Sequence, residues 1–163
     1  MSRDERPVLD LTAVEHRVHE LVNEVRADHD VDQLEFDREL TSVAKGHSVD
    51  MAERGYVAHV SPDGDDFADR YEVAGYDCRV QIPGEGYATG GENVAKTYFM
   101  APLRDGSYHR DVSDVAAGIV DGWMDSPGHR ENILKPFWQC EGIGVHVTDE
   151  DGQLAVYATQ NYC

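Results

Sequence analysis

The chain has 163 residues, 40% of them apolar, and a formal net charge of −18 from 32 acidic and 14 basic side chains. This length suits one domain with a sizeable core, so we expect residues 1–163 to form a single domain whose core spans about 14–162. The composition excludes a disordered chain, and no apolar run is long enough to cross a membrane. The charge argues against binding to a nucleic-acid backbone.

The acidic residues are spread along the whole chain, and the lysines are only Lys45, Lys96 and Lys135. Repulsion among so many like charges weakens a compact state in dilute buffer. At about 1 M salt the Debye length falls to about 3 Å, which screens most of that repulsion. The charge therefore favours an organism or compartment of high salt over an ordinary habitat.

The start of the chain and the cysteines bear on its cellular location. Residues 1–7 contain no apolar stretch, so the sequence shows no secretory signal. Cys78, Cys140 and Cys163 are odd in number, so one disulfide can form and its pairing stays open. A dense disulfide framework is excluded, and cysteine usage does not decide the compartment.

The first helix is predicted from a capping box. Thr12 stands at the N-cap and Glu15 three residues later, and apolar residues follow at helical spacing to about residues 28–30. His16 and His19 fall off the apolar stripe, so we expect both to be solvated.

Two more helices are predicted before residue 76. One begins after Asp37 and ends at Gly55, and the next runs from about residue 65 to 75. His47 lies on the apolar stripe of the second helix, where a satisfied core histidine is expected in preference to a ligand.

His59 precedes the turn sequence Ser61-Pro62-Asp63-Gly64. From the residues alone it is either functional or merely polar and next to a turn. Residues 76–112 are rich in Gly and Pro, and within them Gly90-Gly91-Glu92 leads into an apolar strand or helix start. A carboxylate buried there needs a partner. Residues 96–111 are expected to form an exposed excursion.

A fourth helix, capped by Ser113 or Asp114, leads into the motif WMDSPGHRENIL at residues 123–134. Ser126 as N-cap, followed by proline, begins a short helix with His129 in its first turn. The positive end of a helix dipole lowers the pKa of an imidazole. We therefore expect His129 to be neutral, the form that binds a metal or accepts a proton.

The end of the chain predicts a β-hairpin. Residues 142–148 alternate in polarity, residues 149–152 form the turn, and residues 154–162 return. Helices first and strands last predict an α+β fold with an antiparallel sheet.

Together these motifs resemble the CAP superfamily of cysteine-rich secretory proteins, antigen 5 and pathogenesis-related proteins, also called the SCP domain. The likeness is to its compact prokaryotic branch, and with the acidic composition it suggests a halophilic archaeal source. The residues that carry it are His59 to Gly64 with Phe67 and Arg70, Gly91 to Ala95, and Trp123 to Leu134 followed by Ile143-Gly144-Val145.

The resemblance implies a three-layer α-β-α sandwich with a central antiparallel sheet. It also implies a cavity where two histidines and two acids meet. His59 and His129 match the histidines and Glu92 the first acid. The second acid is replaced by Ser126, next to Asp125, which puts any role that needs two cavity carboxylates in doubt.

Three functions follow from this cavity. The favoured one is a binding module whose cleft beside His59 and His129 takes a peptide, lipid or glycan. The alternative is a metal-dependent, protease-like hydrolase, in which His59 and His129 hold Zn²⁺ and Glu92 is base or ligand. The third is a buried hydrogen-bond network that only fixes the loops. We do not expect Ser126 to act as a nucleophile, because its hydroxyl would be occupied in capping the helix.

The resemblance also implies an extracellular or cell-surface protein, whereas the absence of a signal in this chain leaves a cytoplasmic location open. We expect a monomer.

Overall fold

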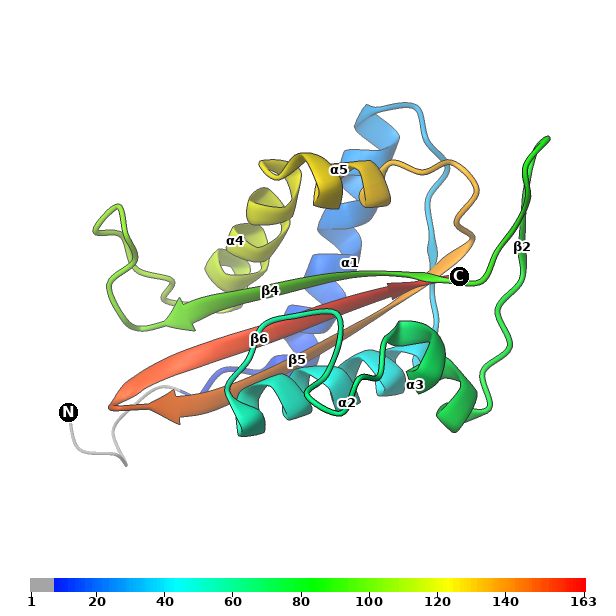
Figure 1. The fold of residues 1–163 in the computed structure, drawn as a ribbon. Helices are drawn as coiled ribbons and strands as arrows, with labels where there is room; N and C mark the ends of the chain where they lie inside the picture. The colour runs from blue at the N-terminus through cyan, green and yellow to red at the C-terminus, as the bar shows by residue number, and fades with distance from the viewer. Residues whose placement is uncertain (1–7) are drawn as a thin grey trace.

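The computed structural model describes residues 8–163, which form a sheet between two groups of helices (Figure 1). The expected α+β sandwich is therefore confirmed, while the expectation about a secretory signal falls on residues outside the described range. In chain order the elements are α1 (Leu11–Asp28), β1 (Glu35–Phe36), α2 (Arg38–Arg54), α3 (Phe67–Ala74), β2 (Val80–Ile82), β3 (Gly86–Ala88), β4 (Gly91–Phe99), α4 (Val112–Met124), α5 (Pro127–Ile133), β5 (Cys140–Glu150) and β6 (Gln153–Tyr162).

The central sheet has the strand order β1-β5-β6-β4. Strand β6 pairs antiparallel with both β5 and β4, and only the two-residue β1 runs parallel to β5. The predicted hairpin is confirmed. Its turn places Asp151 at φ 52° and Gly152 at φ 89°. Positive φ at both central residues is typical of the type I′ turn, whose twist matches that of the flanking strands.

Helix α2 covers one face of the sheet, with α3 beside it, and α1, α4 and α5 cover the other (Figure 1). Two glycines of β5 allow α2 to lie directly on the sheet. A Cβ at Gly144 would lie 2.0 Å from the backbone nitrogen of Lys45, and one at Gly142 would lie 2.2 Å from the carbonyl carbon of Leu40. No other residue fits at these two positions without moving the helix.

The larger core fills the space between the sheet and α1 and α4. Trp123 is buried there, and its indole Nε1 donates a hydrogen bond to the carbonyl oxygen of Val94 at 3.0 Å. This contact fixes the end of α4, and so the start of α5, against β4. A smaller core lies under α2 and contains Met51, Val94 and Tyr157.

The start of α1 differs from the prediction. Asp10, not Thr12, is the N-cap, and its Oδ1 accepts from the backbone N–H of Ala13 at 3.0 Å. Glu15 is buried and accepts from the backbone N–H of Val145 at 2.9 Å, so it is not part of a capping box. The carboxylate of Glu15 thus joins helix to sheet, a tertiary role that the local pattern does not reveal.

His19 is also not solvated, because its Nδ1 lies 2.8 Å from Oε2 of the fully buried Glu141. His16 is exposed, as expected, and its ring stacks on Phe36.

Two boundaries near residue 100 are corrected. Helix α4 begins at Val112 with Asp111 as its N-cap, because the Asp111 side chain accepts from the backbone N–H of Asp114. The exposed excursion does not begin at Lys96, since β4 stays paired with β6 as far as Phe99, whose ring is buried.

The structure settles the cysteine pairing that the sequence left open. Cys78 and Cys163 form a disulfide with a Cα–Cα distance of 5.7 Å. Cys140 is a free, half-buried thiol.

Candidate functional site

The site is built around Glu92, the second residue of β4. Side chains alternate along a strand, so Glu92 and Val94 face α2 while Asn93 faces α5. Register places Glu92 directly opposite Asn161 of β6. Its carboxylate is almost completely buried, with 1% of the side chain exposed.

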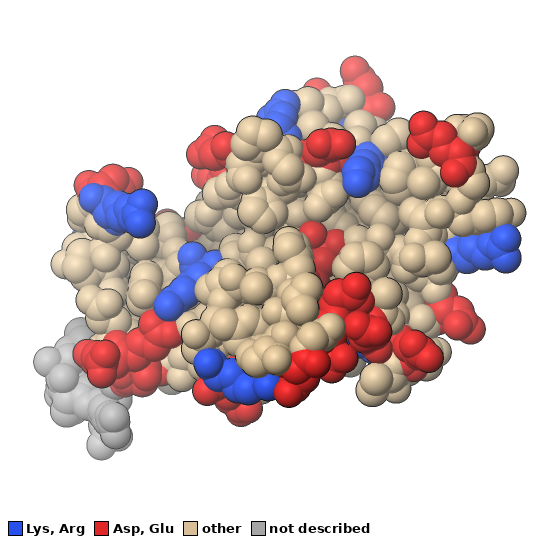
Figure 2. Space-filling model, viewed as in Figure 1, with Lys and Arg blue, Asp and Glu red and all other residues tan. Residues whose placement is uncertain are grey.

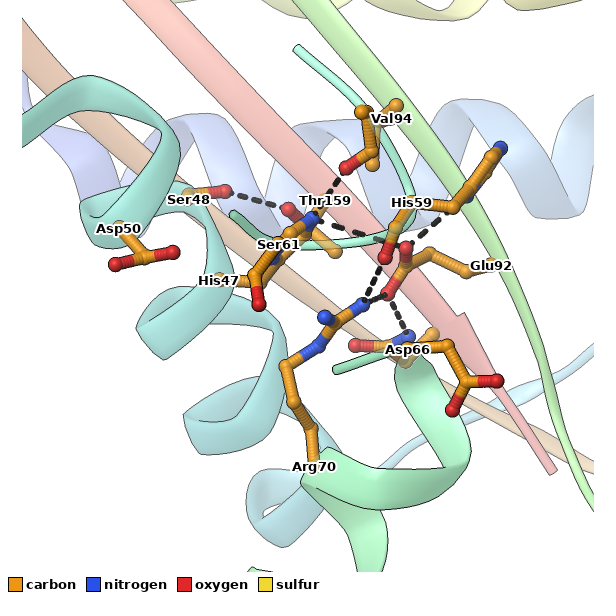
Figure 3. A network of polar contacts seen from close by, with 12 residues as sticks. His47, Ser48, Asp50, His59, Ser61, Asp66, Arg70, Glu92, Val94 and Thr159 are labelled. Atoms are coloured by element: carbon orange, nitrogen blue, oxygen red, sulfur yellow. Dashed lines mark hydrogen bonds and ion pairs between the residues drawn. The ribbon is translucent and has the colours of Figure 1, made fainter. Parts of the chain in front are cut away.

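Three side chains donate hydrogen bonds to this carboxylate (Figure 3). His59 Nδ1 lies 3.0 Å from Oε1, and Oε2 accepts from Arg70 Nη2 at 2.7 Å and from Asn161 Nδ2 at 2.9 Å. Burial alone would raise the pKa of Glu92, but the hydrogen bond from His59 and the charge of Arg70 outweigh it. The pKa therefore lies below the ordinary value of 4.5, and Glu92 is ionised.

Arg70 ties the loop that carries His59 to the sheet. It lies on α3, which begins with a capping box between Asp66 and Asp69. Its Nη2 also donates to the carbonyl oxygen of His59, and its Nη1 donates to that of Asp65, both at 3.1 Å. One guanidinium thus positions both the backbone of His59 and the carboxylate that its ring contacts.

One nitrogen of the His59 ring is fixed by a hydrogen bond, and the other is left for a further partner. An ionised carboxylate only accepts, so Nδ1 carries the proton that it donates to Glu92. In the neutral form of the ring, the other nitrogen, Nε2, has a free lone pair. Half of the side chain, 50%, is exposed. Glu92 therefore holds an imidazole whose Nε2 edge is the part left for other partners.

His47 is part of the same cluster, which the sequence did not predict. It is 1% exposed, its Nε2 donates to the carbonyl oxygen of Ala58 at 2.8 Å, and the same nitrogen lies 3.8 Å from Glu92 Oε1. Burial lowers the pKa of His47 even though Glu92 opposes the shift. His47 is thus a neutral, buried neighbour of Glu92 as well as a core residue.

His129 lies in the first turn of α5, as expected, and is half-buried. Its pKa is lowered in the expected direction, but through burial first and then the charge of His59. The backbone of His129 is fixed by Asn93, whose Nδ2 donates to its carbonyl oxygen at 3.2 Å. Asn132 Nδ2 in turn donates to Asn93 Oδ1 at 3.0 Å and so joins α5 to β4. Within residues 8–163, no hydrogen bond links the imidazole of His129 to Glu92 or His59.

Ser126 occupies the N-cap of α5, but its hydroxyl makes no capping hydrogen bond, so the expected occupation of this hydroxyl is wrong. An activated serine needs a neighbouring base. Among the described residues, no imidazole or carboxylate hydrogen-bonds to Ser126.

A groove of about 500 Å³ lies beside His59 and Glu92. Its floor is formed by Gly90 and Gly91, where β4 begins. Gly90 has φ 136°, and a Cβ there would lie 2.6 Å from the ring of Tyr71, so only glycine fits. The walls come from the His59 loop, the start of α3, β2, β3, α5 and the segment between α5 and β5. The residues that line them are Val60, Asp66, Phe67, Ile82, Ala88, Asn132, Lys135, Phe137 and Trp138.

The donors available to a metal are few. In the described part of the chain, no group of three or more His, Cys, Asp or Glu side chains is placed to hold a metal ion. Catalytic zinc sites use three protein ligands. His59 and His129 supply imidazoles, whereas the oxygens of Glu92 are already engaged.

The sequence missed Arg70, His47 and Asn161 as partners of Glu92. The sequence held a weak indication for two of these partners. Arg70 belongs to the motif around His59, and a buried imidazole such as that of His47 needs a polar partner. The sequence held none for Asn161, since its place opposite Glu92 depends on the register of two strands that are distant in sequence.

Known proteins share this architecture. A sequence model of the cysteine-rich secretory protein family matches residues 19–162. Two proteins of Bacillus subtilis are each 30% identical: the "uncharacterized membrane protein YlbC" over 93% of this chain, and the "uncharacterized protein YkwD" over 82%. The chain spans 34% and 43% of their lengths. None of the helices within residues 8–163 is long and apolar enough to cross a membrane.

Solved structures agree with the sequence relatives. An extracellular protein of Bacillus anthracis that contains an SCP domain superposes with a TM-score of 0.65 at 27% identity, over 97% of this chain and 44% of that one. An outer surface protein of Borrelia burgdorferi has a TM-score of 0.65 at 17% identity, over 94% and 95% of the two chains, and shows the same fold. The chain therefore belongs to the cysteine-rich secretory protein, or CAP/SCP, family.

Proposed function

We propose that this protein is a binding module whose groove beside His59 takes a peptide, lipid or glycan ligand. The observation that carries the proposal is the state of Glu92. Its carboxylate is buried, ionised and bound by His59, Arg70 and Asn161. Such a carboxylate orients its neighbours, whereas a general base must lie within reach of the substrate, and only 1% of the Glu92 side chain is exposed.

The groove has the composition of a ligand site. Apolar side chains such as Ile82 and Phe137 form much of its wall, and a few polar groups are placed among them. His59, Asn132 and Lys135 would fix the orientation of a ligand whose apolar part lies against the wall. A purely structural network would not need the half-exposed imidazole.

Nuclear magnetic resonance of the ¹⁵N-labelled protein tests the proposal. Three probes are added in separate titrations in high salt: a tripeptide mixture, chitotriose, and laurate. We expect one class to shift the imidazole signals of His59 together with the amides of Ile82 and Ala88. The variant Ala88→Phe fills the groove and should abolish these shifts.

The matched control is Val73→Phe, which adds an aromatic ring at a position on α3 that is 90% exposed and lies outside the groove. It should leave the shifts unchanged. If no class shifts the signals of His59, or if both variants behave alike, the groove is not the binding site.

A metal-dependent hydrolase is the second candidate, and one contact favours it. Metal-ligating histidines usually donate their other ring N–H to a carboxylate, as His59 does to Glu92. In this variant of the proposal, Nε2 of His59 and the imidazole of His129 would hold Zn²⁺, and Glu92 would orient His59 instead of acting as base or ligand. The metal would supply a water of lowered pKa.

Calorimetric titration of zinc into chelator-stripped protein tests the second candidate. One-to-one binding that is lost in the double variant His59→Ala/His129→Ala supports a metal site and justifies a screen for hydrolysis. Absence of binding to the wild type excludes the hydrolase and leaves the binding module.

We also propose that the protein acts outside the cytoplasm. The Cys78–Cys163 disulfide suits an oxidising compartment, and the similar Bacillus anthracis protein is described as extracellular. Trapping of free thiols in intact cells by a membrane-impermeant alkylating reagent tests this. Labelling of Cys140 on intact cells supports the proposal, and labelling only after lysis contradicts it.

A further inference from the structure

The three cysteines meet at one end of the sheet, against α2 and α3. All three contact the small core of Leu40, Val43 and Tyr71. Cys163 already forms the disulfide with Cys78, while Cys140 keeps its thiol. A thiol in the same cluster as a disulfide is a potential partner in thiol–disulfide exchange.

The backbone places Cys140 directly opposite Cys163. The N–H of Cys140 donates to the carbonyl oxygen of Cys163 at 2.9 Å, and the N–H of Cys163 donates to that of Cys140 at 3.0 Å. Residues that exchange both hydrogen bonds are a directly opposed antiparallel pair, about 5.5 Å apart between Cα atoms, with side chains on the same face. Disulfides span Cα distances of about 4.4–6.8 Å. Cys163 therefore lies within bonding range of two cysteines.

We propose that Cys140 is an exchange site that moves the disulfide from Cys78–Cys163 to Cys140–Cys163 within the folded chain. The thiolate of Cys140 attacks Sγ of Cys163 and a new S–S bond forms. The bond between Cys78 and Cys163 breaks, and its electron pair leaves on Cys78, which takes up a proton from solvent. One disulfide and one thiol exist before and after, so no oxidant or reductant is needed.

The surroundings of Cys140 set the rate of this step. Its Sγ donates to Asp37 Oδ2 at 3.7 Å and lies 3.6 Å from the hydroxyl of Tyr76. Burial raises the pKa of the Cys140 thiol, and the charge of Asp37 adds to the shift. Glu35, Arg38 and Glu39 are the other charged side chains that line the hollow next to it. The thiolate is therefore scarce at neutral pH, and exchange should accelerate as pH rises.

The exchange has a structural consequence outside the cysteine cluster. Cys78 lies between α3 and β2, and the β2–β3 hairpin is not part of the central sheet. Release of Cys78 would free this segment from the end of β6 (Figure 1). The new disulfide closes a much shorter loop, but that entropy difference belongs to the unfolded chain and does not oppose exchange within the folded one.

Peptide mapping of the native wild-type protein tests the proposal. The protein is incubated at about pH 8.5, where thiolates become populated, and quenched with acid before unfolding. Free thiols are then alkylated at acidic pH and located by mass spectrometry. We expect label on Cys140 at the start, and label on Cys78 that then grows with time while the label on Cys140 falls by the same amount.

The control variant Cys140→Ser has no attacking thiol, so it should show no label on Cys78. Label that stays on Cys140 alone, or that appears on Cys163, overturns the proposal. Label on Cys78 in the Cys140→Ser variant also overturns it, because it would then reflect incomplete oxidation. The test involves no ligand, so its outcome is separate from that of the binding function.

Discussion

Arg70 is the residue that keeps the buried carboxylate of Glu92 ionised. It is 15% exposed, and its guanidinium is the only full positive charge paired with the buried carboxylate of Glu92 within the described residues. A buried carboxylate deprived of its cation either stays charged at a high cost or becomes protonated.

The variant Arg70→Gln should therefore lower the free energy of unfolding by about 3 kcal/mol. It should also raise the pKa of Glu92, which can be measured from the ¹³C chemical shift of its carboxylate as the pH is varied. The control is Arg54→Gln, which removes the exposed ion pairs with Asp50 and Asp63 and should change stability little. Equal losses in the two variants would contradict the assigned role of Arg70.

His47 and His129 make stability depend on pH. Burial lowers the pKa of both below the ordinary value of 6.5, so each binds a proton more weakly in the folded than in the unfolded chain. Their contribution is present in full above pH 6.5 and is lost as pH falls through the lower values of the folded state.

The free energy of unfolding should therefore decrease as the pH is lowered below 6.5. Urea titrations at constant salt would measure this, and His129→Gln should flatten part of the slope. A wild-type protein that becomes more stable on acidification over this range would show that the two histidines are not held neutral.

The contact between α2 and β5 leaves no room for a side chain on β5 at Gly142 and Gly144. Gly144→Ala places a Cβ 2.0 Å from the backbone of Lys45, and neither main chain can move without the other. We expect a loss of about 3 kcal/mol or more, in the range of overpacked cores.

The matched control for this contact is Gly46→Ala on α2, where a Cβ meets nothing within 4 Å. It should raise stability by about 0.5–1 kcal/mol, because alanine favours a helix more than glycine does. Thermal unfolding of both variants checks the pair. A harmless Gly144→Ala would mean that α2 does not lie on β5 as described.

The elements with strong local patterns were predictable from the sequence. The hairpin of β5 and β6 was predictable because the alternation of polar and apolar residues and the turn residues both indicate it. Helix starts were displaced where several capping residues compete, as Asp10 competes with Thr12 and Asp111 with Asp114. The two-residue β1 has no detectable pattern.

The candidate site was predictable only in part. The family motifs identified His59, Glu92 and His129 as candidates, and the structure places His59 in contact with Glu92. The roles of Arg70, His47 and Asn161 depend on how α2, α3 and β6 meet around β4. That arrangement is a property of the packed molecule and not of any one segment.

For the whole molecule, the net charge of −18 predicts stability that depends on salt. Acidic side chains are spread over the face seen in Figure 2, and basic ones stand singly among them. The melting temperature should rise as KCl is increased from low concentration to about 1 M, because the repulsion is screened. A melting temperature that is flat or falls over this range would contradict the proposed adaptation to salt.

In the proposed function, His59 serves a ligand and not the stability of the fold. The direct measurement is the free energy of unfolding of the wild type and of His59→Ala, each with and without the probe class that shifts the His59 signals. The probe should stabilise the wild type by about 2.7 kcal/mol at a hundred times its Kd and should not stabilise the variant. Without probe, the variant should lose no more than about 2 kcal/mol, because its half-exposed side chain gives up one hydrogen bond to the charged Glu92. A variant that loses several kcal/mol while the probe stabilises neither protein would show that His59 and Glu92 form a structural network alone.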